Sequence, residues 1–194
     1  MLTIALHEKA EKCVTEKKKR TVIQTPLGRM LIEGKNGAIE RVSFTDEELL
    51  PATDELLQRA GKQLLQYFAG ERCTFDLPVR MKGTAFQMAA WQALREIPYG
   101  ETVTYGQQAE MMGHPKACRA VGGANHQNRL LILVPCHRVV AKGGMGGFGA
   151  GIEKKLFLLE LEKKNIAKYA PSGAERSENR AAFFMEQAMD EPVK

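Results

Sequence analysis

Apolar and polar positions alternate in the first third of this 194-residue chain, as they do in strands. Within residues 21–44, short apolar groups are separated by polar residues, and two turn signals divide the stretch: Pro26-Leu27-Gly28 and Lys35-Asn36-Gly37. An Asn-Gly pair between alternating segments is a strong hairpin signal. The pattern therefore predicts a small antiparallel sheet.

From Pro51 onward, apolar residues recur at intervals of three and four, which is the period of a helix. This predicts a helix over residues 51–70 that stops at Gly70, and another after residue 84 that closes at Pro98-Tyr99-Gly100. Between them, residues 73–83 are typical of a last strand followed by a linker. We therefore expect an α+β protein with an N-terminal α/β domain (1–83), a helical domain (84–170) and a C-terminal tail (171–194).

Two shorter helices in the second domain have the pattern of a helix-turn-helix. Thr104 can cap a helix that Gly113 ends, and Pro115 can open a second helix over residues 116–126. On this second helix the spacing predicts an inner face of Ala117, Ala120, Val121 and Ala124, with Arg119, Gly122 and His126 pointing away. Gly122 and Gly123 each cost about 1 kcal/mol relative to alanine inside a helix. Either the close approach of another backbone or tight helix packing can require them.

The C-terminal part combines a glycine-rich loop, a last helix and a tail. Residues 143–151 predict a mobile pocket wall, because the phosphate-binding glycine motifs are absent. Residues 153–164 form a helix whose apolar face is so broad that we expect it to be largely buried. Glu160 and Glu162 both fall on apolar faces of this helix, and periodicity does not choose between them. A short helix is expected over residues 181–189.

The net charge of +5 is distributed unevenly. Residues 111–152 contain no Asp or Glu, but they contain five basic residues: Lys116, Arg119, Arg129, Arg138 and Lys142. Such a stretch indicates an anionic partner, most simply a nucleic-acid backbone. The alternative is a chance cluster on a solvated face.

The candidate chemistry lies in the apolar run 131–140, which Pro135, Cys136, His137 and Arg138 interrupt. A free cysteine in such a run is often a small buried hydrophobe. The basic neighbours favour a nucleophile, because they lower a thiol pKa from about 8.5 towards neutrality.

The chain's other cysteines and its apolar runs exclude several classes of protein. None of the 4 cysteines forms a C-x-x-C pair, so a zinc module and a disulfide framework are not expected. No apolar run reaches the roughly 20 residues that cross a membrane, and the N-terminal residues lack the pattern of a signal peptide. We therefore expect a reducing cytoplasm, a free thiol and no membrane partner.

Several motifs between residues 86 and 162 now combine: Phe86-Gln87, Trp91-Gln92-Ala93-Leu94, Ile97-Pro98-Tyr99-Gly100-Glu101-Thr102, Arg119-Ala120-Val121-Gly122-Gly123-Ala124 and Val134-Pro135-Cys136-His137-Arg138-Val139-Val140. In this order, with Tyr105 and Asn128, they resemble the O6-alkylguanine-DNA alkyltransferases, or methylated-DNA–protein-cysteine methyltransferases. Residues before 84 are similar only in the order of elements. The resemblance implies a ribonuclease H-like N-terminal domain and a winged-helix-like DNA-binding domain.

The implied activity is stoichiometric repair of O6-alkylguanine, and of O4-alkylthymine, in DNA. Cys136 would accept the alkyl group as a stable thioether, so each molecule would act once. His137 would take the thiol proton through a water, oriented by Glu162 rather than Glu160. Tyr105 would donate a proton to the leaving guanine ring.

The implied partner is double-stranded DNA, bound in its minor groove by a monomer in a bacterial cytoplasm. Arg119 would fill the space that a flipped nucleotide leaves, and Asn128 would join the DNA-binding helix to the Cys136 segment. Further DNA contacts are implied for Tyr105, Lys116, Ala120, Gly122, Gly123 and Arg129. A substrate pocket is implied for Trp91, Val139, Phe148 and Gly149.

Three departures from the family pattern bear on specificity and metals. Phe148-Gly149 stands where many members carry a tyrosine and a small polar residue, and Leu131 stands where some carry proline. His7, Cys13 and Cys73 do not reproduce the zinc pattern of some members, so we expect no metal and no cofactor.

Three alternatives belong to other classes. The alternative nearest to repair is an alkyltransferase-like protein that binds lesions without transfer. Such proteins typically replace the acceptor cysteine with tryptophan, whereas Cys136 is present here. A helix-turn-helix regulator would have no use for a buried Cys-His-Arg, and a cysteine hydrolase usually has its histidine far from the cysteine in sequence.

Overall fold

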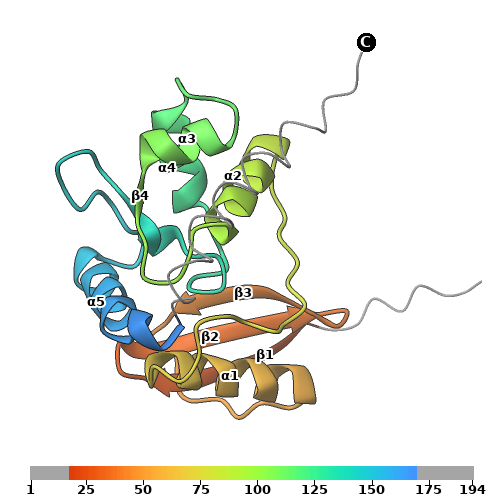
Figure 1. The fold of residues 1–194 in the computed structure, drawn as a ribbon. Helices are drawn as coiled ribbons and strands as arrows, with labels where there is room; N and C mark the ends of the chain where they lie inside the picture. Colours follow the sequence, from red (N-terminus) through yellow and green to blue (C-terminus); the bar gives the residue numbers. More distant parts are fainter. Residues whose placement is uncertain (1–17, 170–194) are drawn as a thin grey trace, which may run out of the picture.

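A three-stranded antiparallel sheet opens the fold in residues 18–169, which are the residues that the computed structural model describes (Figure 1). Its strands β1 (Lys19–Thr25), β2 (Gly28–Lys35) and β3 (Ala38–Phe44) lie in the order β1-β2-β3. The turn between β2 and β3 places Asn36 and Gly37 at φ 49° and 70°. These positive values are what an Asn-Gly hairpin turn requires, so the predicted hairpin is confirmed.

Helix α1 (Glu55–Phe68) covers one face of this sheet. Asp54 caps it by accepting a hydrogen bond from the backbone N–H of Leu57 at 2.8 Å, which is why the helix begins after Pro51 rather than at it. Gly70, at φ 68°, follows the helix end, in agreement with the predicted stop. The buried face of α1 includes Leu57, Ala60, Leu64, Tyr67 and Phe68.

The strand predicted in residues 73–83 is wrong. The segment makes a single parallel bridge to β3, in which the Ile39 N–H donates to Pro78 O and the Arg80 N–H donates to Ile39 O, both at 2.8 Å. Pro78 has no N–H, so it cannot extend a ladder. The segment instead crosses to helix α2 (Ala85–Arg95) as an irregular chain.

The helix-turn-helix consists of α3 (Tyr105–Met111) and α4 (Cys118–His126). Thr104 caps α3 in a reciprocal capping box with Gln107. Helix α4 begins two residues later than predicted, because a turn that ends with the Ala117 N–H bonded to His114 O precedes it. The predicted inner face is also partly wrong: Ala120 is exposed and Ala117 half-buried, and the buried residues are Val121, Ala124 and Asn125.

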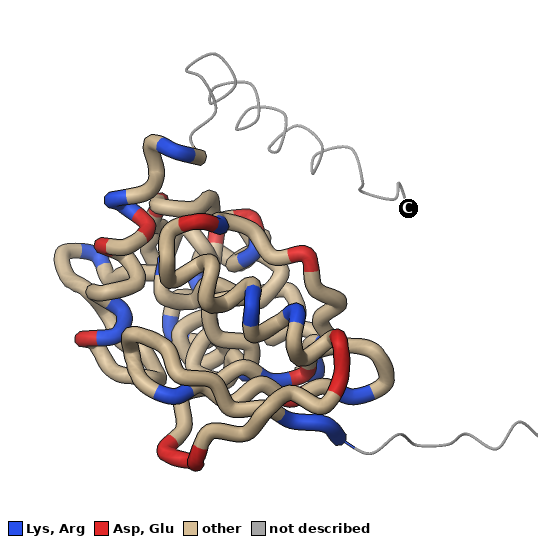
Figure 2. Tube along the Cα trace, turned by 90° about the horizontal axis from the view of Figure 1, so that it is seen from below, with Lys and Arg blue, Asp and Glu red and all other residues tan. Residues whose placement is uncertain are grey.

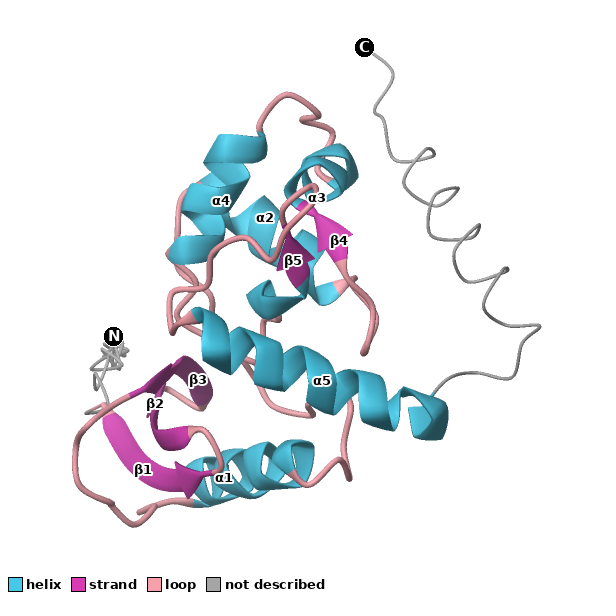
Figure 3. Cartoon of the chain, turned by 90° about the vertical axis from the view of Figure 1, so that its left-hand side faces the viewer, coloured by secondary structure: helices cyan, strands magenta, loops and turns pink. Residues whose placement is uncertain are grey.

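Helix α5 (Ile152–Tyr169) lies between the sheet and the helix-turn-helix (Figure 3). The prediction of a largely buried apolar face is wrong, because Leu156 and Phe157 are 39% and 36% exposed. Only Lys155, Leu158 and Glu162 are fully buried, and their spacing forms one narrow stripe.

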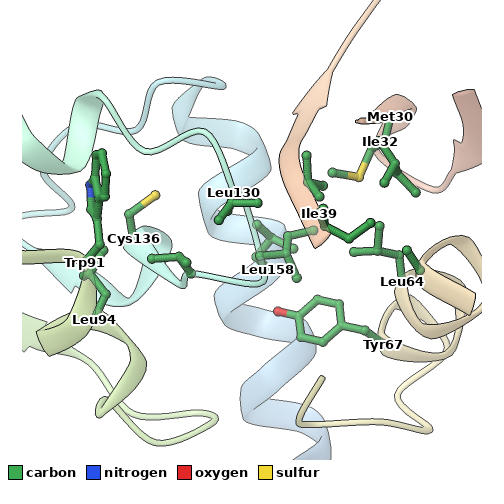
Figure 4. Close-up of a cluster of buried hydrophobic side chains, with 14 of the residues drawn as sticks. Met30, Ile32, Ile39, Leu64, Tyr67, Trp91, Leu94, Leu130, Cys136 and Leu158 are labelled. Atoms are coloured by element: carbon green, nitrogen blue, oxygen red, sulfur yellow. The ribbon is translucent and has the colours of Figure 1, made fainter. Parts of the chain in front are cut away.

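One hydrophobic core joins the two parts of the chain. It runs from Met30 and Ile39 in the sheet through Leu158 of α5 to Trp91 and Leu94 of α2 (Figure 4). The backbone of β3 also pairs with the segment after α4, because the Val42 N–H donates to Arg129 O at 2.8 Å. Among residues 18–169 no helix is long and apolar enough to cross a membrane. The tail and the helix expected at 181–189 lie outside the described residues.

Candidate active site

Cys136 opens a single 3₁₀ turn, Cys136–Arg138, between Pro135 and the short strand β5 (Val139–Val140). Strand β5 pairs in parallel with β4 (Val103–Thr104), which directly precedes α3. The turn therefore holds the thiol beside the helix-turn-helix, with only 7% of the Cys136 residue exposed.

Asn128 fixes the loop that leads from α4 to the thiol. Its amide nitrogen donates to Val134 O at 2.8 Å and to the Cys136 Sγ at 3.2 Å. Its side-chain oxygen accepts the N–H of Leu130 at 2.9 Å. The Asn128 side chain thus connects the end of α4, the loop and the sulfur. This is the position expected of a residue that joins the DNA-binding helix to the Cys136 segment.

The expectation that basic neighbours lower the pKa of the thiol is wrong. Burial raises the pKa of Cys136 to about 11, while the hydrogen bond from Asn128 and the charge of Lys155 only partly oppose this. The adjacent basic side chains do not offset burial, because Arg138 and His137 both point to Glu162. At neutral pH the resting sulfur is therefore a thiol, and a reaction that used it as a nucleophile would need a base to remove its proton.

His137 has the features of that base. Its Nε2 lies 2.9 Å from Glu162 Oε1, and both side chains are fully buried. Burial lowers the pKa of His137, although Glu162 partly opposes the effect, so the ring is neutral at pH 7. The other ring nitrogen, Nδ1, is buried without a hydrogen-bond partner among the described residues. With Nε2 protonated towards Glu162, Nδ1 is left free to accept a proton.

Glu162 is the centre of a buried hydrogen-bond network, whereas Glu160 is exposed. Burial raises the pKa of Glu162, but the hydrogen bonds and charges of His137 and Arg138 outweigh it and hold the pKa far below its usual range. Arg138 donates to both carboxylate oxygens at 2.9 Å, and the Gly100 N–H donates to Oε2 at 2.9 Å. The structure thus makes the choice that periodicity left open.

Tyr67 is a residue that the sequence did not identify. It lies on α1, in the sheet part of the chain, and its hydroxyl donates to Glu162 Oε1 at 2.6 Å and lies 3.4 Å from His137 Nε2. The signal available in the sequence was a tyrosine on the inner face of an amphipathic helix, since a buried tyrosine hydroxyl usually requires a partner.

Lys155 was likewise not identified. It is fully buried on α5, and its ammonium donates to Val139 O and Met145 O at 2.6 Å and to Gly147 O at 3.1 Å. These bonds attach part of the glycine-rich loop to β5. A lysine three positions before Leu158, on the buried stripe, was the signal in the sequence.

The four expected pocket residues lie in different surroundings. Phe148 is half-buried with its ring centre 6.4 Å from that of His137, and a side chain at Gly149 would meet His126. Val139 is fully buried beside the 3₁₀ turn. Trp91 is a core residue whose indole N–H donates to Ala124 O at 2.9 Å.

Most of the expected DNA-binding residues lie on or near α4. Lys116, Arg119, Ala120 and Gly123 are exposed. The Tyr105 ring lies 3.7 Å from the position of a Cβ on Gly122, and the Tyr105 hydroxyl lies 3.5 Å from Gly147 O. A Cβ on Gly123 would meet nothing within 4 Å. Packing inside the described protein therefore does not require a glycine at position 123.

Arg129 is separate from this group. It lines a cavity of about 140 Å³ together with Asn128, Trp91 and charged residues of the sheet part. Several charges of the sheet part are paired, as in Lys18–Glu33 and Arg80–Glu40, and Figure 2 shows basic and acidic positions mixed over this part of the molecule. Within residues 18–169 no three His, Cys, Asp or Glu side chains gather as metal ligands do. His7 and Cys13 lie outside the described range.

Family models match both parts of the chain. The ribonuclease-like domain of 6-O-methylguanine DNA methyltransferase matches residues 18–81, and the DNA binding domain of the same family matches residues 85–164. The methylated-DNA–protein-cysteine methyltransferase of Haemophilus influenzae is 43% identical over 173 residues, covering 84% of this chain and 94% of that protein. That of Methanosarcina acetivorans is 42% identical over 149 residues, covering 73% and 96%.

Solved structures agree. The Mycobacterium tuberculosis O6-methylguanine methyltransferase superposes with a TM-score of 0.70 at 38% identity, covering 82% of this chain and 98% of that one. The same protein in complex with DNA gives 0.68 at 39% identity, covering 75% and 93%.

Fold and site together define a class of protein that uses a buried cysteine beside a DNA-binding helix pair. Within that class, the chain belongs to the methylated-DNA–protein-cysteine methyltransferase family. It repairs alkylated DNA by transferring the methyl group of O6-methylguanine to a cysteine of its own. The α+β fold, with a ribonuclease-like N-terminal domain and a helical DNA-binding domain, is confirmed.

Proposed function

We propose that Cys136 is the cysteine that accepts the alkyl group. In this proposal His137 accepts the proton of the Cys136 thiol, and Glu162 orients the His137 ring. The observation that carries this proposal is the buried pair of Glu162 and His137. Glu162 binds His137 Nε2 and leaves Nδ1 free, and His137 directly follows Cys136 in the chain. Because the pKa of Cys136 is raised to about 11, a thiolate forms only as His137 takes the proton, through an intervening water.

In the transfer step the sulfur attacks the alkyl carbon, so that an S–C bond forms as the bond from carbon to guanine O6 breaks. The thiol proton passes to His137, and Tyr105 donates a proton to the leaving guanine ring. The thioether is stable, so each molecule acts once. O6-alkylguanine is the substrate, with O4-alkylthymine as a second one. No metal or cofactor takes part.

Chemistry at O6 requires the nucleotide to leave the base stack. We place α4 in the minor groove of double-stranded DNA, with Arg119 filling the vacated space. Lys116, Ala120, Gly122 and Gly123 border the DNA and support this orientation by their exposure or small size. Arg129, which lines the separate cavity, would reach the backbone beside the sheet part.

The finer organisation follows from the same proposal. We place the domain boundary near residue 83, in the irregular segment between the two parts, and expect a monomer in a bacterial cytoplasm. Free cysteines in the described chain, at Cys73, Cys118 and Cys136, fit a reducing compartment. Cys136 also argues against the alternative of a lesion-binding protein without transfer, which would lack the acceptor.

The test uses one cysteine as a control for another. After incubation with DNA that carries O6-methylguanine, peptide mass spectrometry should find one methyl group on Cys136 and none on Cys118, which is exposed. Nonspecific methylation would favour the accessible thiol. Repeated turnover, or methylation of Cys136→Ser elsewhere in the chain at the same rate, would contradict the assignment.

Base flipping has a separate test. Arg119→Ala should slow repair in duplex DNA far more than reaction with free O6-benzylguanine, because only the duplex reaction requires a vacated stack to be filled. Lys116→Ala is the control: it removes a neighbouring exposed cation and should weaken DNA binding, but at saturating duplex DNA its repair rate should stay near that of the unaltered protein, whereas that of Arg119→Ala should stay low. Equal losses in both reactions for Arg119→Ala would exclude the flipping role.

A further inference from the structure

An apolar groove on the sheet part is not used by the chemistry described above. It has a volume of about 780 Å³ and runs between β1, residues 49–52 and α1. Leu49, Leu50 and Leu65 line it and are 57%, 39% and 45% exposed, so that it holds three of the six exposed large apolar side chains in residues 18–169. A contiguous apolar surface of this kind is typical of a binding site.

The C-terminal end of the described chain lies beside this groove. The Tyr169 hydroxyl donates to Gly70 O at 3.0 Å, and the Lys168 ammonium reaches the same carbonyl at 3.5 Å. The residues on either side of Gly70, Ala69 and Glu71, both line the groove. The described chain therefore ends at Tyr169, beside the C-terminal end of α1 (Figure 3). At the other terminus, Lys18 lines the separate 140 Å³ cavity.

The tail has a sequence that fits the groove. Ala181, Phe184, Met185, Ala188 and Met189 repeat at intervals of three and four, which is one apolar stripe of a helix. Phe183 falls off this stripe. The tail also lies beyond the family model, which ends at residue 164, so the shared activity does not account for it.

The length of the connection fits as well. The 11 residues between Tyr169 and Ala181, as a flexible chain, span about 18 Å. Helix α1, with 14 residues, is about 21 Å long. A tether that matches its target distance gives an effective concentration on the order of 1 mM. Even a contact of modest affinity is then mostly formed.

We propose that residues 181–189 dock as a helix in the groove between β1 and α1 of the same chain. The stripe that includes Phe184 covers Leu50 and Leu65, in the mode by which amphipathic helices occupy apolar grooves. The tail thereby removes an exposed apolar surface from the sheet part and leaves the DNA-binding face free.

Nuclear magnetic resonance on the full chain tests this docking. We expect nuclear Overhauser contacts between the Phe184 ring and the methyl groups of Leu50 and Leu65. Phe184→Ala, which removes this ring, should also abolish the contacts of the Met185 and Ala188 methyl groups with these leucines. It should raise amide exchange in the groove about tenfold, if the tail binds with a Kd on the order of 0.1 mM at an effective concentration on the order of 1 mM. Phe183→Ala, the same change one residue away and off the stripe, should leave the contacts with Leu50 and Leu65 in place.

The groove side has its own matched pair. Leu65→Gln should release the tail, whereas Leu156→Gln, at a similarly exposed leucine on α5 outside the groove, should not. Absence of tail contacts in the full chain, or equal effects within either pair, would overturn the proposal. Contacts that form only between differently labelled molecules would show that a second copy fills the groove, and would overturn it too. None of these outcomes depends on alkyl transfer.

Discussion

Removal of the Tyr67 hydroxyl perturbs the site from the other part of the molecule. Tyr67→Phe deletes one of the five hydrogen bonds donated to Glu162, the other four coming from His137, Arg138 (two) and Gly100. The ring stays in place among its neighbours, because only an oxygen is lost. A buried hydrogen bond to a charged group contributes about 1.5–3 kcal/mol, and we expect the free energy of unfolding to fall by that amount.

The rate of methyl transfer should fall as well. If half of the lost energy serves to orient Glu162 against His137, the barrier rises by about 1 kcal/mol, which is about a fivefold slower reaction. The pH dependence gives a sharper readout. Without the Tyr67 donor, Glu162 carries a less neutralised charge, which raises the pKa of His137. In the proposed mechanism His137 accepts the thiol proton only when neutral, so the acidic limb of the pH–rate profile should move to higher pH.

Tyr99→Phe is the matched control. The Tyr99 hydroxyl is buried without a hydrogen-bond partner among the described residues, and its ring packs edge-on against Tyr67 at 6.0 Å. The same atom is removed from the same cluster, but no bond to Glu162 is lost. Single-turnover rates with O6-methylguanine DNA from pH 5 to 9 compare the two variants. Equal rates, or a Tyr67→Phe variant that is destabilised without any movement of the acidic limb, would refute the positioning role.

Two further predictions concern α4 and acid stability. Gly123→Ala should stabilise the protein by about 0.5–1 kcal/mol, since helical glycine is unfavourable and nothing lies within 4 Å of the new Cβ. The same change should weaken binding to duplex DNA. Thermal melts and a binding titration would show whether the two effects have opposite signs, and tighter DNA binding would exclude close approach of DNA at this position. Burial lowers the pKa of His137 in the folded state, so the unfolded chain protonates first and stability should decline as the pH falls below about 6.5. Urea unfolding should give a free energy of unfolding that depends less on pH for His137→Gln. An unchanged dependence on pH would contradict the stated cause.

Much of the local structure follows from the sequence because its causes are local. The Asn36-Gly37 turn forms since these two residues tolerate positive φ, and Thr104 begins α3 since its side chain can accept a helical N–H. The motif at Pro135 places a thiol and an imidazole on consecutive residues. The predictions were wrong where neighbours in space decide the structure. Pro78 lies beside the edge strand β3 but cannot extend it, and α5 is buried along a narrow stripe only.

The sequence by itself determined that Cys136 and His137 stand together, which elements flank them, and that the surrounding segment is basic. The resemblance named Glu162, which periodicity did not distinguish from Glu160. Only the tertiary structure decided that the Glu162 carboxylate is buried against the imidazole, that Tyr67 from 95 residues away donates to Glu162, and that the thiol pKa is raised rather than lowered. The physical reason is that desolvation and hydrogen bonding depend on what surrounds a group in space. Arg138 is close to Cys136 in the sequence, but its side chain points to Glu162, because the fold places that carboxylate within hydrogen-bond distance.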